Sequence, residues 1–311
     1  MKPIAPSVIA PPAEFVDKVQ RMFGDRGRAW LPTLPDIITR CREKWGLAEG
    51  APAQFMSMNW IEFTTAAAGD PVALKIGVPH DDLFTEIEAL RAFEGNGAVH
   101  LVDADRELAA ILMDRIIPGT MLWKLGDDEE QTRLAGAVMC ELSVMVPARH
   151  RMPRLGDQVA KAFARNRTTP ELVELMPEEL MCCAEDLLRQ MLEDEPCEVM
   201  LHGDLHHENI LLDKHRGWLA IDPKGVIGPG PYQAARFLNN RIPDGATTNT
   251  RATMMRTRLH ILGDLLGHSP STLAAATFID CILGTSWSFE DEGSFDVSPS
   301  LDHARMLQRF L

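Results

Sequence analysis

The stretch LHGDLHHENILL, residues 201–212, constrains this chain more than any other part of its sequence. Its apolar ends are typical of short buried strands, and between them lies a polar group that includes His202, Asp204 and Asn209. Burial of such groups costs free energy unless they are hydrogen-bonded or used in binding. We therefore expect an ordered loop with a chemical role.

The spacing inside this loop indicates the chemistry. Asp204 and Asn209 are separated by four residues, which is the spacing of a kinase catalytic loop. Strands at 209–213 and 217–222 would form a hairpin that returns Asp222 beside Asn209. Asp204 would then accept the proton of an acceptor hydroxyl. Asn209 and Asp222 would offer oxygen ligands to Mg²⁺, and His202 is expected to brace the loop.

A lysine within an apolar strand is the second feature that needs a partner. Lys75 lies in the middle of the predicted strand 72–76, and an amphipathic helix is predicted directly afterwards at 81–93. Glu86 on that helix, or else Glu88, could pair with Lys75, as in the pair with which kinases position the α- and β-phosphates. The alternatives are a lysine on an edge strand that reaches solvent and a solvated helix carboxylate.

Secondary-structure patterns change along the chain from strands to helices, which favours two lobes with a cleft over alternating strand–helix units. We expect a helical extension at 1–49, an N-terminal lobe at 50–115 and a helical C-terminal lobe at 116–311. Residues 1–12 are expected to be an extended, proline-rich lead. Helices are predicted at 13–23, 35–45, 129–145, 155–164 and 171–192, and further strands at 58–65, 98–102 and 109–113.

The link between the two lobes is predicted from the order of the elements alone. The segment 111–119, ILMDRIIPG, leaves a strand and breaks at Pro118-Gly119. In kinases, the backbone at this point binds the adenine base, so Met113 and Arg115 are candidate nucleotide-binding residues.

Charge and hydropathy exclude several classes of protein. The formal net charge is −14, which argues against nucleic-acid binding and is compatible either with solubility or with a cationic substrate. The prolines near the N-terminus interrupt any signal sequence, and no apolar run is long enough to span a membrane. We therefore expect a cytoplasmic protein. Whether it is a monomer or a homodimer is left open.

Together, LHGDLHHENILL and AIDPKG resemble the aminoglycoside phosphotransferase family, which shares the protein-kinase fold. VALKIG, EIEALRAF, GAVHLVDAD, ILMDRIIPG and WSFED resemble its streptomycin 6-kinase/hydroxyurea phosphotransferase branch. The resemblance covers residues 50–291 and implies an α+β fold with an antiparallel-sheet lobe and a mainly helical lobe. It implies ATP and Mg²⁺ as cofactors. It also implies Asp204 as the base, Asn209 and Asp222 as metal ligands, and Lys75 with Glu86 as the phosphate-positioning pair.

Two positions depart from the family pattern. The phosphate-covering loop near 52–57, PAQFMS, has no glycine, although backbone amides approach a phosphate most closely where side chains are absent. Either the phosphates would be poorly covered, or phosphate contact would use Ser57. The second departure is Gln233, which stands where the family usually carries an acid after Tyr232, so the support of the catalytic loop would differ.

The resulting hypothesis is a small-molecule O-phosphotransferase, with a streptomycin-type aminoglycoside or hydroxyurea as acceptor. His206, Glu290 and Asp291 are candidate substrate residues, because an acidic run near the C-terminus could bind cations or could be a solvated loop. One alternative is a kinase-like protein that binds nucleotide without catalysis. A remote one is a metal hydrolase that uses the histidines of HGDLHH.

Overall fold

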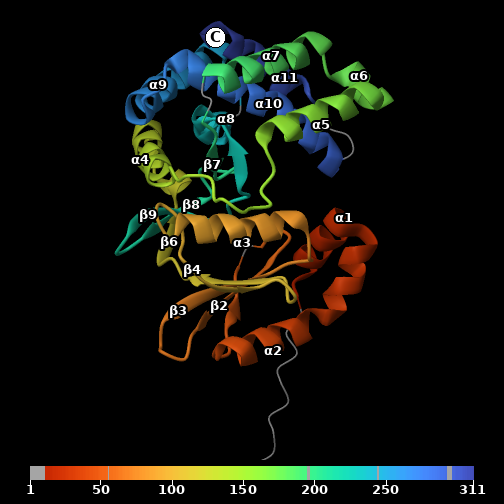
Figure 1. Ribbon diagram of the computed structural model, residues 1–311, viewed down its shortest axis with the longest axis vertical. Coiled ribbons are helices and arrows are strands. Elements are labelled where there is room, and N and C mark those ends of the chain that lie inside the picture. Colours follow the sequence, from red (N-terminus) through yellow and green to blue (C-terminus); the bar gives the residue numbers. More distant parts are fainter. Residues whose placement is uncertain (1–10, 55, 195–196, 244, 293–295) are drawn as a thin grey trace, which may run out of the picture. The chain divides into compact units, whose positions relative to one another are not determined.

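The computed structural model describes residues 11–54, 56–194, 197–243, 245–292 and 296–311 (Figure 1). For residues 289–292 it describes the backbone alone. The chain divides into two compact units. Unit 1 comprises Met1–Ile87 and Val99–Arg115, and unit 2 comprises Glu88–Ala98 and Ile116–Leu311. Most of the predicted lead at 1–12 lies outside the described residues.

A five-stranded antiparallel sheet forms the centre of unit 1, in the order β1-β2-β3-β5-β4. Strand β3 is therefore an interior strand, and the sequence-based alternative of Lys75 on an edge strand is wrong. The strand predicted at 98–102 begins later, at Leu101, because Ala98 instead forms a bridge with Ala220 in unit 2. The strands are β1 (Ala51–Pro52), β2 (Trp60–Thr65), β3 (Pro71–Ile76), β4 (Leu101–Asp105) and β5 (Ala110–Asp114).

Two N-terminal helices, α1 (Ala13–Trp30) and α2 (Leu34–Trp45), share a hydrophobic core with this sheet. The ring of Phe15 packs edge-on against that of Trp60, at 6.0 Å between centroids. The first helical segment ends at Gly24 as predicted, because Gly24 has non-helical dihedral angles, with φ 55° and ψ −128°. A second helical segment, which the prediction did not include, continues α1 beyond this kink to Trp30. Gly46, with a φ of 61°, ends α2 as predicted.

Helix α3 (Asp81–Phe93) has the predicted bounds and begins in unit 1. Its residues Leu83 and Ile87 are buried, as expected for an amphipathic helix.

Unit 2 is built mainly of helices (Figure 1), and α10 lies against α5, α7, α8, α9 and α11. Many of its apolar side chains are fully buried, in keeping with a helix that is covered on most sides. The helix predicted at 171–192 is interrupted at Pro177, because proline lacks the backbone donor that a continuous helix needs. The helices are α4 (Asp128–Glu141), α5 (Leu155–Thr168), α6 (Pro170–Leu175), α7 (Glu178–Asp194), α8 (Ala235–Asn239), α9 (Thr248–Leu266), α10 (Pro270–Glu292) and α11 (Ser298–Leu307).

Two small antiparallel sheets in unit 2 hold the segment that contains the sequence motif. Strand β7 (Val199–Leu201) pairs with β10 (Val226–Gly228), and β8 (Ile210–Asp213) pairs with β6 (Pro118–Met121) and β9 (Gly217–Ala220). The predicted hairpin is therefore present as β8–β9, with Ile210 opposite Ala220. Among the described residues, no helix is long and apolar enough to cross a membrane.

Candidate active site

In unit 1, the predicted partner of Lys75 is Glu86. The ammonium nitrogen of Lys75, on β3, lies 2.7 Å from each carboxylate oxygen of Glu86, on α3. Both side chains are buried, with 3% and 7% of their surfaces exposed. A buried ion pair is weak evidence for stability, because desolvation of the two charges offsets most of their attraction. The pair is thus formed as expected, and its role toward phosphates stays a prediction. Glu88 has a different partner, the backbone N–H of Arg151.

The other candidate nucleotide-binding residues of unit 1 lie in or beside the sheet. Ser57 is exposed, and Met113 is buried in β5. The backbone N–H of Arg115 donates to the carbonyl of Pro71, and its guanidinium lies over the ring of Phe63 at 4.4 Å. The Arg115 N–H is therefore already used within the sheet. The adenine-binding interpretation of this segment stays a prediction.

In unit 2, the loop between β7 and β8 is held in shape by His202. Its Nε2 donates to the carbonyl of Ile221 at 2.9 Å, and its Nδ1 accepts from the backbone N–H of Asp204 at 3.3 Å. Burial lowers the pKa of His202 to about 4, so the ring is neutral and can serve both bonds. The expected bracing role of His202 is present in the geometry.

Gly203 is required by the same loop. It adopts a φ of 82°, and a Cβ atom at this position would lie 2.9 Å from Cγ2 of Val226 and 3.3 Å from Cβ of Lys224. A side chain would therefore meet both an unfavourable backbone conformation and a steric overlap.

Gln233 supports the loop in place of the acid that the family pattern usually has. Its side-chain oxygen accepts a hydrogen bond of 2.9 Å from the backbone N–H of His202. An amide oxygen accepts such a bond without adding a negative charge. The substitution thus leaves the His202 N–H satisfied.

The hairpin brings the two candidate metal ligands to one place. The backbone N–H of Ile221 donates to the carbonyl of Asn209 at 2.9 Å, so Asp222 follows directly after a residue bonded to Asn209. The side-chain nitrogen of Asn209 donates to the carbonyl of Asp204 at 3.0 Å, which orients its amide. Asp222 adopts a φ of 57°, a strained conformation of the kind that clusters at functional sites. One amide oxygen and one carboxylate form a donor set that fits Mg²⁺.

The carboxylate of Asp204 lies between the guanidinium group of Arg236 and the ring of His206. Oδ1 is 3.4 Å from Nε of Arg236, and Oδ2 is 3.9 Å from Nε2 of His206. The Asp204 side chain keeps 26% of its surface exposed. His206 also contacts Glu208, at 2.9 Å from Nδ1 to Oε2, and Glu208 pairs in turn with Arg241. The Asp204 carboxylate is therefore partly exposed, and its orientation is supported from both sides.

Arg236 was not expected from the sequence. It lies on α8 and also faces Asp280 of α10, whose Oδ2 is 3.8 Å from its Nη1. The neighbouring carboxylate of Asp280 raises the pKa of Arg236, so it remains cationic. The one signal in the sequence is an arginine within an otherwise apolar helical segment. Its partner Asp280 lies 44 residues away in sequence, so no local pattern links the two.

The histidines of HGDLHH do not converge on a common metal position. His202 is bonded to Ile221, and the buried ring of His207 stacks on Phe237 at 4.0 Å between centroids. The described part of the chain contains no group of three His, Cys, Asp or Glu side chains arranged to hold a metal. The contacts of these rings give the metal-hydrolase alternative no support.

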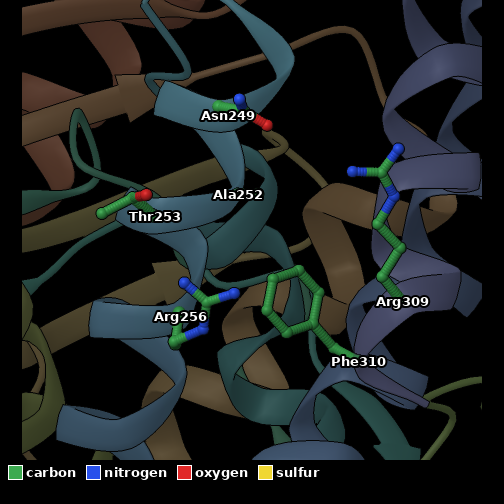
Figure 2. Close-up of a pocket in the computed structure, with 6 residues that line it drawn as sticks. All are labelled: Asn249, Ala252, Thr253, Arg256, Arg309 and Phe310. Carbon is green, nitrogen blue, oxygen red and sulfur yellow. The ribbon is translucent and has the colours of Figure 1, made fainter.

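Two further regions do not contribute to the geometry of the catalytic loop. The side chains of Glu290 and Asp291 are outside the described residues. A cavity of about 320 Å³ lies between α9 and the C-terminal segment (Figure 2). Its lining contains no catalytic-loop residue and consists of Asn249, Ala252, Thr253, Arg256, Arg309 and Phe310.

Comparison with known proteins identifies the family. The model of the aminoglycoside/hydroxyurea antibiotic resistance kinases matches residues 46–293. The chain belongs to this family. It is 27% identical over 300 residues to streptomycin 6-kinase of Streptomyces glaucescens, covering 93% of this chain and 94% of the relative. It is 28% identical over 298 residues to hydroxyurea phosphotransferase of Kitasatospora aureofaciens, covering 92% and 82%. As a member of the family, it is a phosphotransferase that acts on a hydroxyl group.

Solved structures confirm the predicted fold class. Aminoglycoside phosphotransferase APH(4)-Ia, in a ternary complex with ADP and hygromycin B, matches with a TM-score of 0.59 at 15% identity, covering 88% of this chain and 97% of that chain. A choline/ethanolamine kinase family protein from Mesorhizobium loti matches with a TM-score of 0.61 at 12% identity, covering 88% and 94%. The fold is the protein-kinase-like fold, with an antiparallel sheet in one unit and mainly helices in the other.

Proposed function

We propose that this chain transfers the γ-phosphoryl group of ATP to a hydroxyl group of a small molecule in a Mg²⁺-dependent reaction. The observation that carries the proposal is the local order of the catalytic loop. Asp204 is partly exposed and is flanked by Arg236 and His206, while hydrogen bonds join its loop to the segment that carries Asp222. A protein that only bound nucleotide would need no such base.

In the proposed reaction, Asp204 accepts a hydrogen bond from the acceptor hydroxyl and takes its proton as the new oxygen–phosphorus bond forms. The bond between the γ-phosphorus and its bridging oxygen breaks, and ADP leaves. His202 stays neutral and takes no part in proton transfer, because both ring nitrogens are already hydrogen-bonded. Asn209 and Asp222 would hold Mg²⁺, which offsets charge on the phosphates. Lys75, oriented by Glu86, would contact the α- and β-phosphates.

The acceptor is proposed from the family alone. Relatives are named streptomycin 6-kinase and hydroxyurea phosphotransferase, so an aminoglycoside of the streptomycin type and hydroxyurea are the first acceptors to examine. His206 is proposed as an acceptor-binding residue, which its position 3.9 Å from Asp204 supports. Glu290 and Asp291 remain candidates for binding a cationic one.

The decisive experiment measures acceptor-dependent formation of ADP with Mg²⁺ and identifies the product by mass spectrometry. Streptomycin, other aminoglycosides and hydroxyurea form the acceptor panel. Replacement of the base, Asp204→Ala, is expected to lower turnover by a factor of about 10² or more. Asp264→Ala, an exposed aspartate on α9, is the matched control and should keep full turnover. Equal turnover of wild type and Asp204→Ala would exclude the catalytic role of Asp204, and absence of turnover in wild type with every acceptor would favour the binding-protein alternative.

A further inference from the structure

A second cavity in unit 2 adjoins the catalytic loop through Arg236. Its volume is about 330 Å³, which is within the range of small-molecule pockets. We call it the Arg236 pocket. Helices α8, α9, α10 and α11 supply most of its wall, which consists of Arg236, Asn239, Ile242, Arg251, Asp280, Cys281, Gly284, Thr285, Ser288, Pro299, Ser300 and His303.

Arg236 connects this pocket to the base. The same guanidinium group that lies 3.4 Å from Asp204 forms part of the pocket wall. A molecule bound in the pocket would therefore lie one side chain away from the carboxylate that receives the proton. The location suits a part of the acceptor molecule other than its reacting hydroxyl.

The charged groups of the wall are more cationic than anionic. Arg236 and Arg251 both line the pocket, and the Nε of Arg251 donates to the carbonyl of Ala246. Among the described residues, the terminal nitrogens of Arg251 make no hydrogen bond, so they are available to a ligand. Among the described residues of the wall, Asp280 is the single acid, and 2% of its surface is exposed.

Asp280 has little capacity left for a cationic ligand. Its Oδ1 accepts from the hydroxyl of Tyr232 at 3.0 Å, and its Oδ2 accepts from the side-chain nitrogen of Asn239 at 2.8 Å. The same Oδ2 faces Nη1 of Arg236. Because its charge is compensated within the protein, Asp280 serves to hold Arg236 and Asn239 rather than to attract a positively charged group.

His303 adds an acceptor without adding charge. Its Nε2 donates to the side-chain oxygen of Asn239 at 3.0 Å, which leaves Nδ1 as a buried acceptor with no partner among the described residues. Burial, together with Arg251 and Arg258, lowers the pKa of His303 to about 4, so the ring is neutral near pH 7. His303 therefore contributes a neutral ring to the wall and holds Asn239 in place.

Hydroxyl groups of the wall also present acceptors. Thr285 donates its hydroxyl proton to the carbonyl of Cys281 at 2.8 Å, and Ser288 donates to that of Gly284 at 3.1 Å. Each oxygen keeps lone pairs that can accept from a ligand. The wall therefore combines hydroxyl-accepting atoms with two guanidinium groups.

We propose that the Arg236 pocket binds a hydroxyl-bearing part of the acceptor that carries no positive charge, and that Arg251 selects for an anionic group there. The inference rests on the proposed function, since it assigns a subsite for the same acceptor. It separates this chain from an enzyme whose acceptor would place a guanidinium or ammonium group at this position.

The test uses three sugars that share a ring and differ in charge: D-glucosamine, D-glucose and D-glucuronate. Dissociation constants are measured on the full chain by ligand-observed NMR titration, at a slightly acidic pH where the amine is protonated. Glucuronate and glucose are expected to bind more tightly than glucosamine. Arg251→Gln should weaken glucuronate binding by about tenfold, the effect of losing one charge-assisted contact, and should change glucose binding little.

Arg256→Gln is the matched control, because Arg256 is an exposed arginine on the same helix that lines the other cavity (Figure 2). It should leave all three constants unchanged. Tightest binding of glucosamine, no binding of any of the three sugars, or equal effects of the two substitutions would overturn the inference.

Failure of the pocket assignment and failure of the proposed function would give different results. Acceptor-dependent ADP formation that is lost in Asp204→Ala, combined with a preference for glucosamine, would overturn only the charge preference of the pocket. Binding of glucuronate that depends on Arg251, combined with no phosphotransfer to any acceptor in the panel, would overturn the proposed function and leave the pocket assignment standing.

Discussion

At the scale of single residues, Gln233 shows how a family position can change while its contact is kept. The backbone N–H of His202 needs an acceptor because it is part-buried, and the amide oxygen of Gln233 provides it at 2.9 Å. The sequence marks this position as a departure from the family pattern, and the structure shows that the departure leaves the donor satisfied. The effect on the loop is therefore expected to depend on the acceptor atom rather than on a charge.

This view predicts different results for two substitutions of Gln233. Gln233→Leu removes the acceptor and should lower stability by about 1–3 kcal/mol, the penalty of an unsatisfied buried donor, with a fall in kcat from displacement of Asp204. Gln233→Glu keeps an acceptor oxygen and should retain kcat to within a few-fold. Urea unfolding and steady-state phosphotransfer measure the two effects. Similar kcat values for Gln233→Leu and wild type would show that the contact does not position the base.

The candidate site residues of the catalytic loop could be proposed from the sequence, whereas Arg236 and its partner could not. Asp204, Asn209 and Asp222 belong to short motifs whose spacing is fixed by one hairpin, so a local pattern is enough to find them. Arg236 meets Asp204 and Asp280 only because α8 and α10 pack together. Contacts of that kind depend on the tertiary structure and leave no periodic signal in the sequence.

At the scale of elements, strands and helix starts were easier to predict than helix ends. Helix α3 and the β8–β9 hairpin have nearly their predicted bounds, because amphipathic spacing and turn residues mark both. The helical segment that follows the kink at Gly24 and the interruption at Pro177 were both missed. After a glycine the chain can become helical again following a change in φ, whereas proline removes a hydrogen bond and ends the helix locally.

Helices α4 and α9 are joined by a buried arginine that no amphipathic pattern predicts. Arg258, on α9, has 1% of its side chain exposed and lies 2.6 Å from a carboxylate oxygen of Asp128, on α4. It also donates to the carbonyl of Asn240 at 2.8 Å. These bonds satisfy a charge that would otherwise be very costly to bury.

Arg258→Met is therefore expected to lower the free energy of unfolding by about 3 kcal/mol, because it leaves Asp128 and a buried carbonyl without their partner. Denaturant unfolding measures this change. Arg256→Met, on the exposed face of the same helix, should change stability by no more than about 0.5 kcal/mol. A loss below about 1 kcal/mol for Arg258→Met would mean that the bonds to α4 and Asn240 are replaced by packing.

At the scale of the whole molecule, three buried histidines make folding sensitive to acid. Burial lowers the pKa of His202 to about 4, that of His207 to about 3 and that of His303 to about 4. In the unfolded chain, each would titrate near 6.5. Below that pH the unfolded state binds more protons than the folded state, so stability falls as the pH falls from about 6.5 toward 4.

The contribution of one histidine can be isolated at His207, which is buried and stacked on Phe237. Between pH 7 and pH 5, protonation of His207 in the unfolded state should lower the free energy of unfolding by about 2 kcal/mol. His207→Gln removes this protonation. Between pH 7 and pH 5 the variant should therefore lose about 2 kcal/mol less stability than wild type loses.

His215→Gln, at an exposed position, is the control. Urea unfolding at both pH values compares the differences, which cancels any pH-independent effect of each substitution. If wild type and His207→Gln lose equal stability, the ring is not held neutral in the folded protein.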